Sequence, residues 1–365
     1  MKKVMTIFGT RPEAIKMAPL VKELKTRDHI QTIVCVTAQH RQMLDQVLQV
    51  FDIQPDYDLD IMKTGQSLSL ITTKVLTGLE EIIKQEQPDL ILVHGDTTTT
   101  YASALAAYYH QVKIGHVEAG LRTYQKYSPF PEEMNRQMVG VLADYHFAPT
   151  QVSKQNLLAE GKKEDTIFVT GNTAIDALST TVKKEYEHPI FDWVKDDKLI
   201  LLTAHRRENL GEPMKHMFRA IHRIVKEHED VKVVYPIHMN PIVRDTAREI
   251  FGDHDRVRII EPLEVIDFHN FMNKAYMILT DSGGIQEEAP SLGKPVLVLR
   301  DTTERPEGIE AGTLKLAGTK ENDIYAMMKE LLNNKEIYNI MAHASNPYGD
   351  GYASKRIVDI IESMK

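Results

Sequence analysis

The sequence predicts an α/β fold made of two doubly wound domains, each a parallel sheet with helices on both faces. The chain has 365 residues, which is long enough for two compact cores. Short, β-branched apolar runs alternate along it with longer segments whose apolar residues recur at every third or fourth position. The pattern is absent once, between residues 183 and 198, and starts again after them. We therefore expect two sheets, with a linker in that interval.

The predicted elements follow the chain in order. In the first domain the strands are 4–8, 32–36, 90–93, 113–117, 145–148 and 167–170, and the helices include 12–24, 42–50, 68–84 and 98–109. In the second domain the strands are 199–203, 232–236, 257–260, 277–280 and 296–299, followed by helical residues 322–332. A final amphipathic helix, 353–364, is expected to return to the first domain. The predicted domains are therefore 1–185 together with 352–365, and 196–351.

Composition and charge exclude several classes of protein. Hydrophobic residues make up 42% and charged residues 26%, as in an average globular protein. The formal net charge of -8 argues against a nucleic-acid partner, which usually requires a basic patch. A single cysteine, Cys35, excludes an internal disulfide and favours a reducing compartment. No apolar stretch approaches the roughly 20 residues that cross a bilayer, and the N-terminal run is too short for a signal peptide. We expect a cytoplasmic protein with no membrane partner.

Polar residues that follow the strands are the first candidates for a site, because open parallel sheets bind ligands beyond the carboxyl ends of their strands. The first strand is followed by Gly9-Thr10-Arg11-Pro12-Glu13, with Lys16 one turn into the next helix. Glycine allows a tight turn and proline suits the first helical turn, so Arg11 and Lys16 are placed to face an anion. The alternative interpretation is a solvated charge pair at a helix start.

Carboxylates are expected to converge at the same edge of the sheet. Asp96 and Glu118 follow neighbouring strands, and Glu132 or Glu133 opens a helix after a proline-bounded loop. Converging carboxylates raise one another's pKa, which suits general acid–base chemistry near neutral pH. The structural alternatives are that Asp96 caps a helix and that Glu132 or Glu133 favours a helix N-terminus.

A metal site and a bound cofactor have less support. His94, Asp96, His116 and Glu118 lie at alternate positions of two strands and could form a metal site. The phosphate site expected in the second domain would then have no purpose, so we expect no metal. The sequence contains neither a G-x-x-x-x-G-K-[ST] loop nor a G-x-G-x-x-G fingerprint, which argues against ATP hydrolysis and a bound dinucleotide.

The second domain presents a basic loop and a glycine turn after its strands. His205-Arg206-Arg207 can bind a diphosphate, or can form a structural network of ion pairs. Asp281-Ser282-Gly283-Gly284 joins a strand to a helix, so its amides and the helix dipole can bind phosphate, unless packing alone requires the glycines. Glu288 is placed to accept both hydroxyls of a ribose, and Arg305 to face the same cleft.

Six motifs, taken in their order and spacing, closely resemble the non-hydrolysing bacterial UDP-N-acetylglucosamine 2-epimerases over nearly the whole chain. They are Gly9-Thr10-Arg11-Pro12-Glu13, Gly95-Asp96-Thr97-Thr98-Thr99, His116-Val117-Glu118-Ala119-Gly120-Leu121-Arg122, Pro131-Glu132-Glu133-Met134-Asn135-Arg136, His205-Arg206-Arg207-Glu208 and Asp281-Ser282-Gly283-Gly284. The resemblance implies two Rossmann-like, doubly wound domains in a glycosyltransferase-B-like arrangement, with the active site in the interdomain cleft. It also implies a homodimer.

The resemblance further implies a reaction without redox cofactor or metal. UDP and the C2 proton leave UDP-N-acetylglucosamine to give 2-acetamidoglucal, and re-addition with inversion at C2 gives UDP-N-acetylmannosamine. The C2 hydrogen is not next to a carbonyl, so its loss depends on breaking the C1–O bond and on cations at the departing diphosphate. The product would supply N-acetylmannosamine units for a cell-surface polysaccharide such as teichoic acid or a capsule.

Residue roles also follow from the resemblance. The catalytic residues are implied to be Asp96, Glu118, Glu132 and His205, with the carboxylates carrying protons on two faces of C2. The implied substrate-binding residues are Arg11, Lys16, Phe268, Ser282, Gly283, Gly284, Glu288 and Arg305, with Phe268 near the uracil. A second, activating substrate site is implied at Gln39, His40, Gln42, Arg206 and His238.

Three rival functions stay open. A hydrolysing epimerase would release free N-acetylmannosamine and UDP. A glycosyltransferase of the same architecture is disfavoured by the carboxylate-rich loops. A non-enzymatic UDP-sugar sensor would have no need for converging carboxylates.

Overall fold

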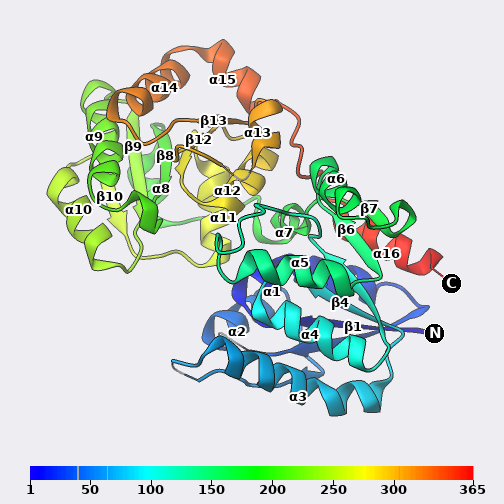
Figure 1. Ribbon diagram of the computed structural model, residues 1–365. Helices are drawn as coiled ribbons and strands as arrows, with labels where there is room; N and C mark the ends of the chain where they lie inside the picture. The colour runs from blue at the N-terminus through cyan, green and yellow to red at the C-terminus, as the bar shows by residue number, and fades with distance from the viewer. Residues whose placement is uncertain (39–40, 64, 304, 365) are drawn as a thin grey trace. The chain divides into compact units, whose positions relative to one another are not determined.

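The chain folds into two compact units that the backbone enters in turn. The computed structural model describes residues 1–38, 41–63, 65–303 and 305–364. The first unit comprises Met1–Thr180 and Tyr348–Lys365, and the second comprises Thr181–Pro347. Each unit has its own parallel sheet, so the predicted class of two doubly wound α/β domains is confirmed (Figure 1). Along the described residues, no helix is both long and apolar enough to cross a membrane.

The first unit contains, in its described part, a seven-stranded parallel sheet of order β3-β2-β1-β4-β5-β6-β7. The strands are β1 (Lys2–Phe8), β2 (Ile30–Val36), β3 (Tyr57–Asp58), β4 (Leu90–His94), β5 (Lys113–Val117), β6 (Tyr145–Ala148) and β7 (Ile167–Val169). All but β3 were predicted to within a few residues. This edge strand was missed because Tyr57–Asp58 has no apolar run to mark it.

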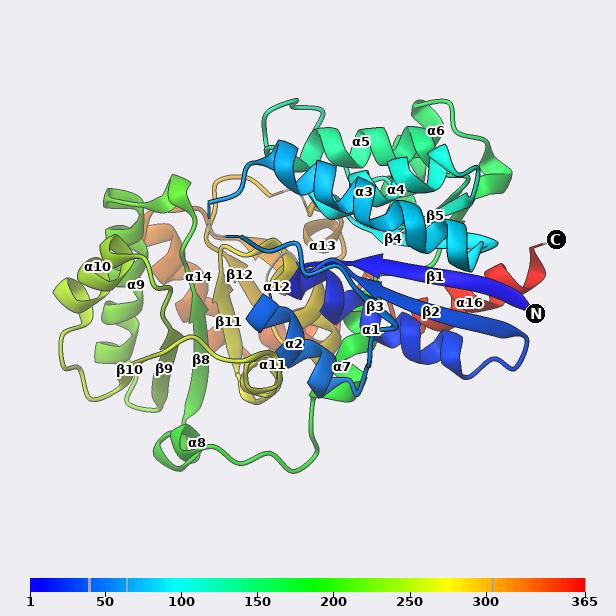
Figure 2. The ribbon, with the colours of Figure 1, turned by 90° about the horizontal axis from the view of Figure 1, so that it is seen from below.

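Helices cover both faces of this sheet. Val4 and Phe8 of β1 share a core with α1, α2 and α16, while Met5 and Ile7 share another with α3, α4 and α5 (Figure 2). Because both faces are buried, the strands are continuously apolar. The helices are α1 (Arg11–Lys25), α2 (Arg41–Val50), α3 (Leu68–Glu86), α4 (Thr98–Tyr109), α5 (Glu132–Leu142), α6 (Gln151–Ala159), α7 (Thr173–Thr181) and α16 (Ala353–Ser363), with a 3₁₀ turn, η1 (Glu164–Thr166).

The C-terminal helix α16 completes the first unit. Its Ile357, Val358 and Ile361 are buried in the core that also contains α1. Lys2 Nζ, at the start of β1, donates hydrogen bonds to the carbonyls of Ile361 at 2.7 Å and Met364 at 2.5 Å. Residues from the two ends of the described chain therefore share one core.

The second unit contains, among its described residues, a six-stranded parallel sheet of order β10-β9-β8-β11-β12-β13. The strands are β8 (Lys198–Thr203), β9 (Val231–Pro236), β10 (Val257–Ile260), β11 (Met277–Thr280), β12 (Val296–Val298) and β13 (Leu314–Leu316). The helices are α8 (Pro189–Val194), α9 (Glu212–Glu227), α10 (Pro241–Phe251), α11 (Val265–Lys274), α12 (Gly283–Glu288), α13 (Pro306–Glu310), α14 (Glu321–Asn333) and α15 (Lys335–Ala342), with 3₁₀ turns η2 (Arg207–Asn209) and η3 (Ala289–Leu292). Helices α9, α10 and α14 share the main core with one face of the sheet.

The unit boundaries fall a few residues from the predicted 185 and 351, and local hydrogen bonds explain both differences. Thr181 belongs to the second unit, where its carbonyl accepts from Asn270 Nδ2 at 2.9 Å. Tyr348 belongs to the first unit, where its carbonyl accepts from the Asn172 amide at 2.7 Å. The expected linker, 183–198, is also not an open connection, because α8 lies within it and places Trp193 under the Arg258 guanidinium.

Each sheet has one point at which the strand order reverses, between β1 and β4 in the first unit and between β8 and β11 in the second. Loops that leave such neighbouring strands diverge to opposite faces of the sheet and leave room for a ligand. The loops after these four strands carry Arg11, Asp96, His205 and Ser282. The fold therefore places predicted site residues at both reversal points.

The burial of α16 predicts the effect of shortening one of its core side chains. Ile357 is 0% exposed, so Ile357→Ala should lower the free energy of unfolding of the first unit by about 2–5 kcal/mol through lost burial and a cavity. Ile340→Ala is the matched control, because Ile340 is 65% exposed on α15 and should change stability by less than about 0.5 kcal/mol. Urea denaturation followed by circular dichroism and amide hydrogen exchange measures both. Equal urea midpoints for the two variants would show that α16 does not stabilise this unit.

Candidate active site

A buried carboxylate, Glu13, ties together the two loops at the reversal point of the first sheet. Its Oε2 accepts from the amides of Gly9 at 3.0 Å and Thr10 at 2.7 Å, which forms a capping box at the start of α1. Its Oε1 accepts from the hydroxyls of Thr97 at 2.6 Å and Thr100 at 3.0 Å, at the start of α4. Glu13 therefore holds the loops that carry Arg11 and Asp96 in a fixed relation.

Glu118 lies at the centre of the charged groups of the first unit. It directly follows β5 and adopts a left-handed backbone conformation, with φ of 63°, which is uncommon outside glycine. Its Oε2 forms an ion pair with Lys16 Nζ, accepts from Asn172 Nδ2 at 3.0 Å, and lies 3.6 Å from His94 Nε2. Lys16 is thus bound to a carboxylate and is not half of a solvated pair with Arg11. Strained backbone at a buried charge marks this residue as a functional candidate.

Asp96 lies beside the same cluster. Thr97, and not Asp96, caps α4, since the Thr97 hydroxyl accepts from the Thr100 amide. The Asp96 carboxylate is 2.8 Å from the Arg136 guanidinium, and its carbonyl accepts from Asn135 Nδ2 at 2.9 Å. The side chain keeps 27% of its surface exposed. Asp96 is therefore held toward α5 and still reaches solvent.

Burial, modified by the surrounding charges, shifts the pKa of Asp96 toward neutrality. Burial raises the pKa of Asp96 to about 6, the Arg136 guanidinium opposes this rise, and the charges of Glu118 and Glu132 add to it. Glu118 and Glu132, two carboxylates predicted from the sequence, thus lie within electrostatic reach of Asp96. A carboxyl group that titrates near pH 6 can both donate and accept a proton under physiological conditions.

The two adjacent glutamates of α5 have different surroundings. Glu133 is 0% exposed and accepts from the amides of Thr123 and Tyr124, both at 3.0 Å, and from Gln137 Nε2 at 2.7 Å. Burial acts to raise the pKa of Glu133, but these hydrogen bonds lower it below the ordinary value. Glu133 is therefore an ionised carboxylate, and its hydrogen bonds fix the loop that precedes α5. Glu132, at the first position of α5, is half-buried, and its charge contributes to the raised pKa of Asp96.

Two histidines under this edge are buried and uncharged near pH 7. Burial lowers the pKa of His94 to about 4 and that of His116 to about 3. His116 Nε2 lies 2.8 Å from the Gly95 carbonyl oxygen, so one ring nitrogen is used by the backbone. Across the described ranges, no group of three or more His, Cys, Asp or Glu side chains is placed to hold a metal ion.

A second buried carboxylate, Asp281, organises the reversal point of the second sheet. Its Oδ2 accepts from the amides of His205 at 2.9 Å and Arg206 at 2.8 Å, and from Asn209 Nδ2 at 3.1 Å. Arg206 Nε also donates to the Asp281 carbonyl at 2.7 Å. The His205 ring stacks on His238, with centroids 5.1 Å apart. The predicted diphosphate residue His205 and the predicted activator residues Arg206 and His238 therefore lie in one cluster.

The glycine turn follows Asp281 directly. The Ser282 amide donates to Thr280 Oγ1 at 3.0 Å, so Ser282 can meet a ligand only through its hydroxyl. Gly283 and Gly284 open α12, where the first amides of a helix have no intrahelical acceptor. The amides of Gly283 and Gly284 are therefore available to an anion.

Side chains near this turn are held by specific partners. Glu288 Oε2 lies 3.5 Å from His269 Nε2, and His269 Nδ1 lies 2.7 Å from Thr181 Oγ1. Phe268, beside His269 on α11, is half-buried. The guanidinium of Arg305 forms an ion pair with Glu287, which is 1% exposed. Glu288 is thus positioned beside the glycine turn, and Arg305 carries a partly neutralised charge.

Some predicted residues have less structural context. Arg11 is half-buried at the first position of α1. Gln39 and His40 lie outside the described residues, and so does the side chain of Gln42, whose backbone belongs to α2. The activator site assigned to these residues stays a prediction.

Asn172 was not among the predicted site residues, although it follows a strand as Asp96 and Glu118 do. Asn172 follows a predicted strand at the same edge of the sheet, but its amide side chain was not considered among carboxylates and cations. The structural roles of Glu13 and Asp281 were also missed. Both belong to motifs that were read for ligand binding, and only the hydrogen bonds show that they bind the protein itself.

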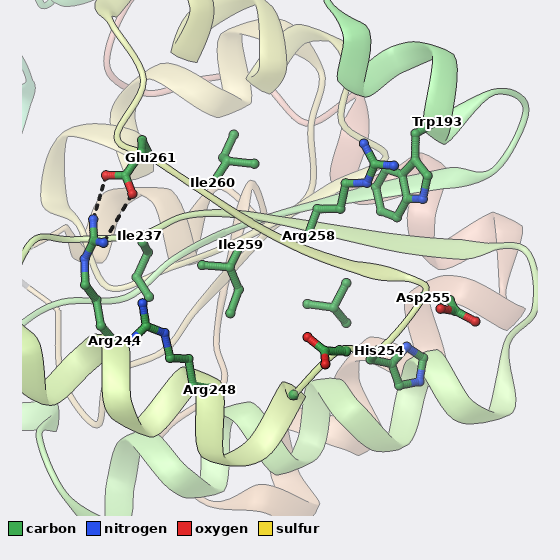
Figure 3. Close-up of a pocket in the computed structure, with 13 residues that line it drawn as sticks. Trp193, Ile237, Arg244, Arg248, His254, Asp255, Arg258, Ile259, Ile260 and Glu261 are labelled. Atoms are coloured by element: carbon green, nitrogen blue, oxygen red, sulfur yellow. Dashed lines mark hydrogen bonds and ion pairs between the residues drawn. The ribbon is translucent and has the colours of Figure 1, made fainter.

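A hollow of about 700 Å³ in the second unit runs along β10 and α10, away from the reversal point (Figure 3). Two of its cationic side chains have partners, since Arg258 stacks on Trp193 at 4.5 Å and Arg244 binds Glu261 at 2.6 Å. None of the residues predicted for the site lines it. The hollow therefore does not belong to the candidate active site.

Comparisons with known proteins agree on one family. The family model described as UDP-N-acetylglucosamine 2-epimerase matches residues 22–362. The chain is 69% identical to the UDP-N-acetylglucosamine 2-epimerase of Bacillus subtilis (strain 168), over 98% of this chain and 94% of that protein. A crystal structure of a putative UDP-N-acetylglucosamine 2-epimerase from Listeria monocytogenes matches with a TM-score of 0.96 and 61% identity, over 100% of this chain and 96% of the other. The UDP-GlcNAc 2-epimerase of Neisseria meningitidis, solved bound to UDP-GlcNAc, matches with a TM-score of 0.89 and 50% identity, over 99% and 100% of the two chains.

The ion pair between Asp96 and Arg136 predicts a pKa change that is independent of activity. Arg136→Met removes the positive charge that lowers the pKa of Asp96, so this pKa should rise above about 6. Carbon-13 NMR titration of labelled aspartate carboxyl groups measures it, with the signal assigned by its loss in Asp96→Asn. Arg27→Met is the control, because Arg27 pairs with Glu23 and Asp359 instead. The same Asp96 pKa in both variants would contradict the assigned role of Arg136.

Proposed function

Since the chain belongs to the UDP-N-acetylglucosamine 2-epimerase family and is therefore an isomerase, we propose that it interconverts UDP-N-acetylglucosamine and UDP-N-acetylmannosamine without net hydrolysis. The observation that carries this proposal is the cluster of Asp96, Glu118 and Glu132 beside Lys16 and Arg136 in the first unit. Inversion at C2 needs a proton removed from one face of the sugar and returned to the other. A site with several acid–base groups suits that requirement.

The chemical step is an elimination followed by its reversal. One carboxylate takes the C2 proton, the electrons of the C2–H bond form the C1=C2 double bond of 2-acetamidoglucal, and the C1–O electrons leave with UDP. A proton then adds to the opposite face of C2 while a UDP oxygen re-forms the bond to C1. Asp96 suits a group that exchanges its proton, because its pKa is about 6. Glu118 suits a base, because Lys16 stabilises its charged form.

Cations and amides stabilise the charge that the departing UDP carries. In the first unit these are Arg11 and Lys16, at the start of α1. In the second unit His205, Arg305 and the amides of Gly283 and Gly284 hold the diphosphate. Glu288, positioned by His269, takes the ribose hydroxyls, and Phe268 lies near the uracil. No redox cofactor or metal enters this scheme, since the C2 hydrogen leaves and returns as a proton.

The proposed product points to a biosynthetic role. UDP-N-acetylmannosamine would supply N-acetylmannosamine units for a cell-surface polysaccharide, such as teichoic acid or a capsule. A cytoplasmic location is consistent with the free, buried thiol of Cys35.

A homodimer is part of the same proposal. Tyr108, Tyr109 and Val141 on α4 and α5 are 59%, 61% and 72% exposed, which leaves apolar surface for a second copy. Sedimentation equilibrium would contradict the dimer if it gave the 41.6 kDa of one chain.

Proton NMR in deuterium oxide tests the reaction. Incubation with UDP-N-acetylglucosamine should place deuterium at C2 of both UDP-sugars, because the departing proton exchanges with solvent. Glu118→Gln should slow this exchange by about 10²–10⁴-fold. Glu80→Gln is the control, since that carboxylate pairs with Lys84 on the exposed side of α3.

Other products would identify a rival function. Free N-acetylmannosamine together with UDP would mean a hydrolysing epimerase. Unchanged substrate without deuterium would favour a glycosyltransferase or a UDP-sugar sensor.

Activation by substrate is a further expected property. Turnover of pure UDP-N-acetylmannosamine should begin slowly and accelerate when trace UDP-N-acetylglucosamine is added, because an occupied second site would favour the active state. Progress curves with and without the trace measure this effect. An immediate full rate with pure UDP-N-acetylmannosamine would rule out the proposed activation.

A further inference from the structure

Asn172 contacts the carboxylate at the centre of the candidate site. It lies between β7 and α7, is 2% exposed, and donates from Nδ2 to Glu118 Oε2 at 3.0 Å. No role for it follows from the predicted motifs. An almost fully buried amide that touches a buried carboxylate is a candidate for controlling that carboxylate.

Other hydrogen bonds fix the position of Asn172 and the orientation of its side chain. Its backbone amide donates to the Tyr348 carbonyl at 2.7 Å, and its backbone carbonyl accepts from the Ile175 amide at 3.1 Å. Its side-chain Oδ1 accepts from the Ala174 amide at 2.9 Å. An amide turned the other way would set its NH₂ against the Ala174 N–H and its oxygen against a carboxylate. The NH₂ group is therefore committed to Glu118.

The other groups near Glu118 Oε2 are less suited to hold it through a reaction. Lys16 has a long, flexible side chain, and under the proposed function its charge also serves the diphosphate. His94 is more distant, at 3.6 Å. Of these three described neighbours of Glu118 Oε2, Asn172 is the one that combines a short hydrogen bond with an anchored donor.

We propose that Asn172 is the positioning residue for Glu118, holding its carboxylate in one orientation while Lys16 interacts with the departing diphosphate. This inference rests on the proposed role of Glu118 as an acid–base group. A neutral donor is suited to the task, because it orients the carboxylate without adding a second positive charge to that of Lys16, which would lower the basicity of Glu118 further. The left-handed backbone of Glu118 also calls for an anchoring contact, since a strained residue keeps its conformation only when its surroundings hold it.

Asn172→Asp tests the proposal by changing one side-chain group. Oδ1 remains for the Ala174 amide, and an oxygen replaces the NH₂ that faces Glu118. We expect kcat to fall by about 10- to 100-fold, as for a misplaced reacting group, with KM for the UDP-sugar within about 2-fold of wild type. The acid limb of the kcat/KM profile should also move to higher pH, because a second carboxylate raises the pKa of Glu118. The charged and titratable groups that already face Glu118, namely Lys16, His94 and Asp96, are unchanged.

Two further variants make the test specific. Asn172→Ser keeps an oxygen for the Ala174 amide but removes the donor and adds no charge, so kcat should fall without the upward shift of the acid limb. If circular dichroism shows that Asn172→Asp is unfolded, the kcat of Asn172→Ser tests the proposal by itself. Asn334→Asp is the matched control, because Asn334 Oδ1 accepts from the amides of Glu336 and Ile337 at the start of α15. It should leave kcat and the pH profile unchanged.

The outcomes separate this inference from the proposed function. Wild-type kcat and pH profile in both folded Asn172 variants, with a slow Glu118→Gln, would overturn the positioning role alone. A Glu118→Gln variant as fast as wild type would instead remove the proposed role of Glu118, and this inference with it.

Discussion

A buried carboxylate at the strand-order reversal of each sheet is the interaction on which the predicted site residues of that unit depend. Glu13 joins the loops after β1 and β4, and Asp281 joins the loops after β8 and β11. Glu13 accepts from donors in both loops, whereas Asp281 itself follows β11 and accepts from donors that follow β8. Loops that diverge at such a point have few contacts with each other, so a buried hydrogen-bond acceptor is an effective way to fix their relative positions. Loss of either carboxylate would leave buried donors unpaired, at a cost of about 1–3 kcal/mol for each.

In the first unit, several carboxylates lie near one another because hydrogen bonds fix the backbone that carries them and neighbouring cations offset their charge. Glu118 and Glu132 both repel Asp96, while Lys16 pairs with Glu118 and Arg136 pairs with Asp96. The compensation at Asp96 is incomplete, because burial outweighs the attraction of Arg136. The result is one carboxyl group that titrates near neutral pH beside another that is held by a cation and an amide. Paired environments of this kind are how proteins obtain an acid and a base from the same residue type.

Most of the fold was predicted from the alternation of strand and helix patterns in the sequence. The strands were recognisable because a strand that is buried on both faces is a continuous apolar run. The short edge strands β3 and β13 were missed, since Tyr57–Asp58 and Leu314–Leu316 are too brief to form a pattern. The rule that ligands bind after strand ends selected Asp96, Glu118 and His205. It could not separate residues that face a ligand from those that face the protein. Glu13, Glu133 and Asp281 occur in the same motifs, and only three-dimensional hydrogen bonding distinguishes them.

The return of the chain to the first unit has a consequence for biosynthesis. The second unit, Thr181–Pro347, is an insertion within the first, and helix α1 packs against α16, which is encoded after that insertion. At about 5–20 residues per second, the ribosome needs about 10–30 s to make the inserted unit. During this interval the part of α1 that α16 later covers has no partner, and the nascent first unit must avoid aggregation with an open core. The unit whose synthesis begins first is thus the last to complete its core.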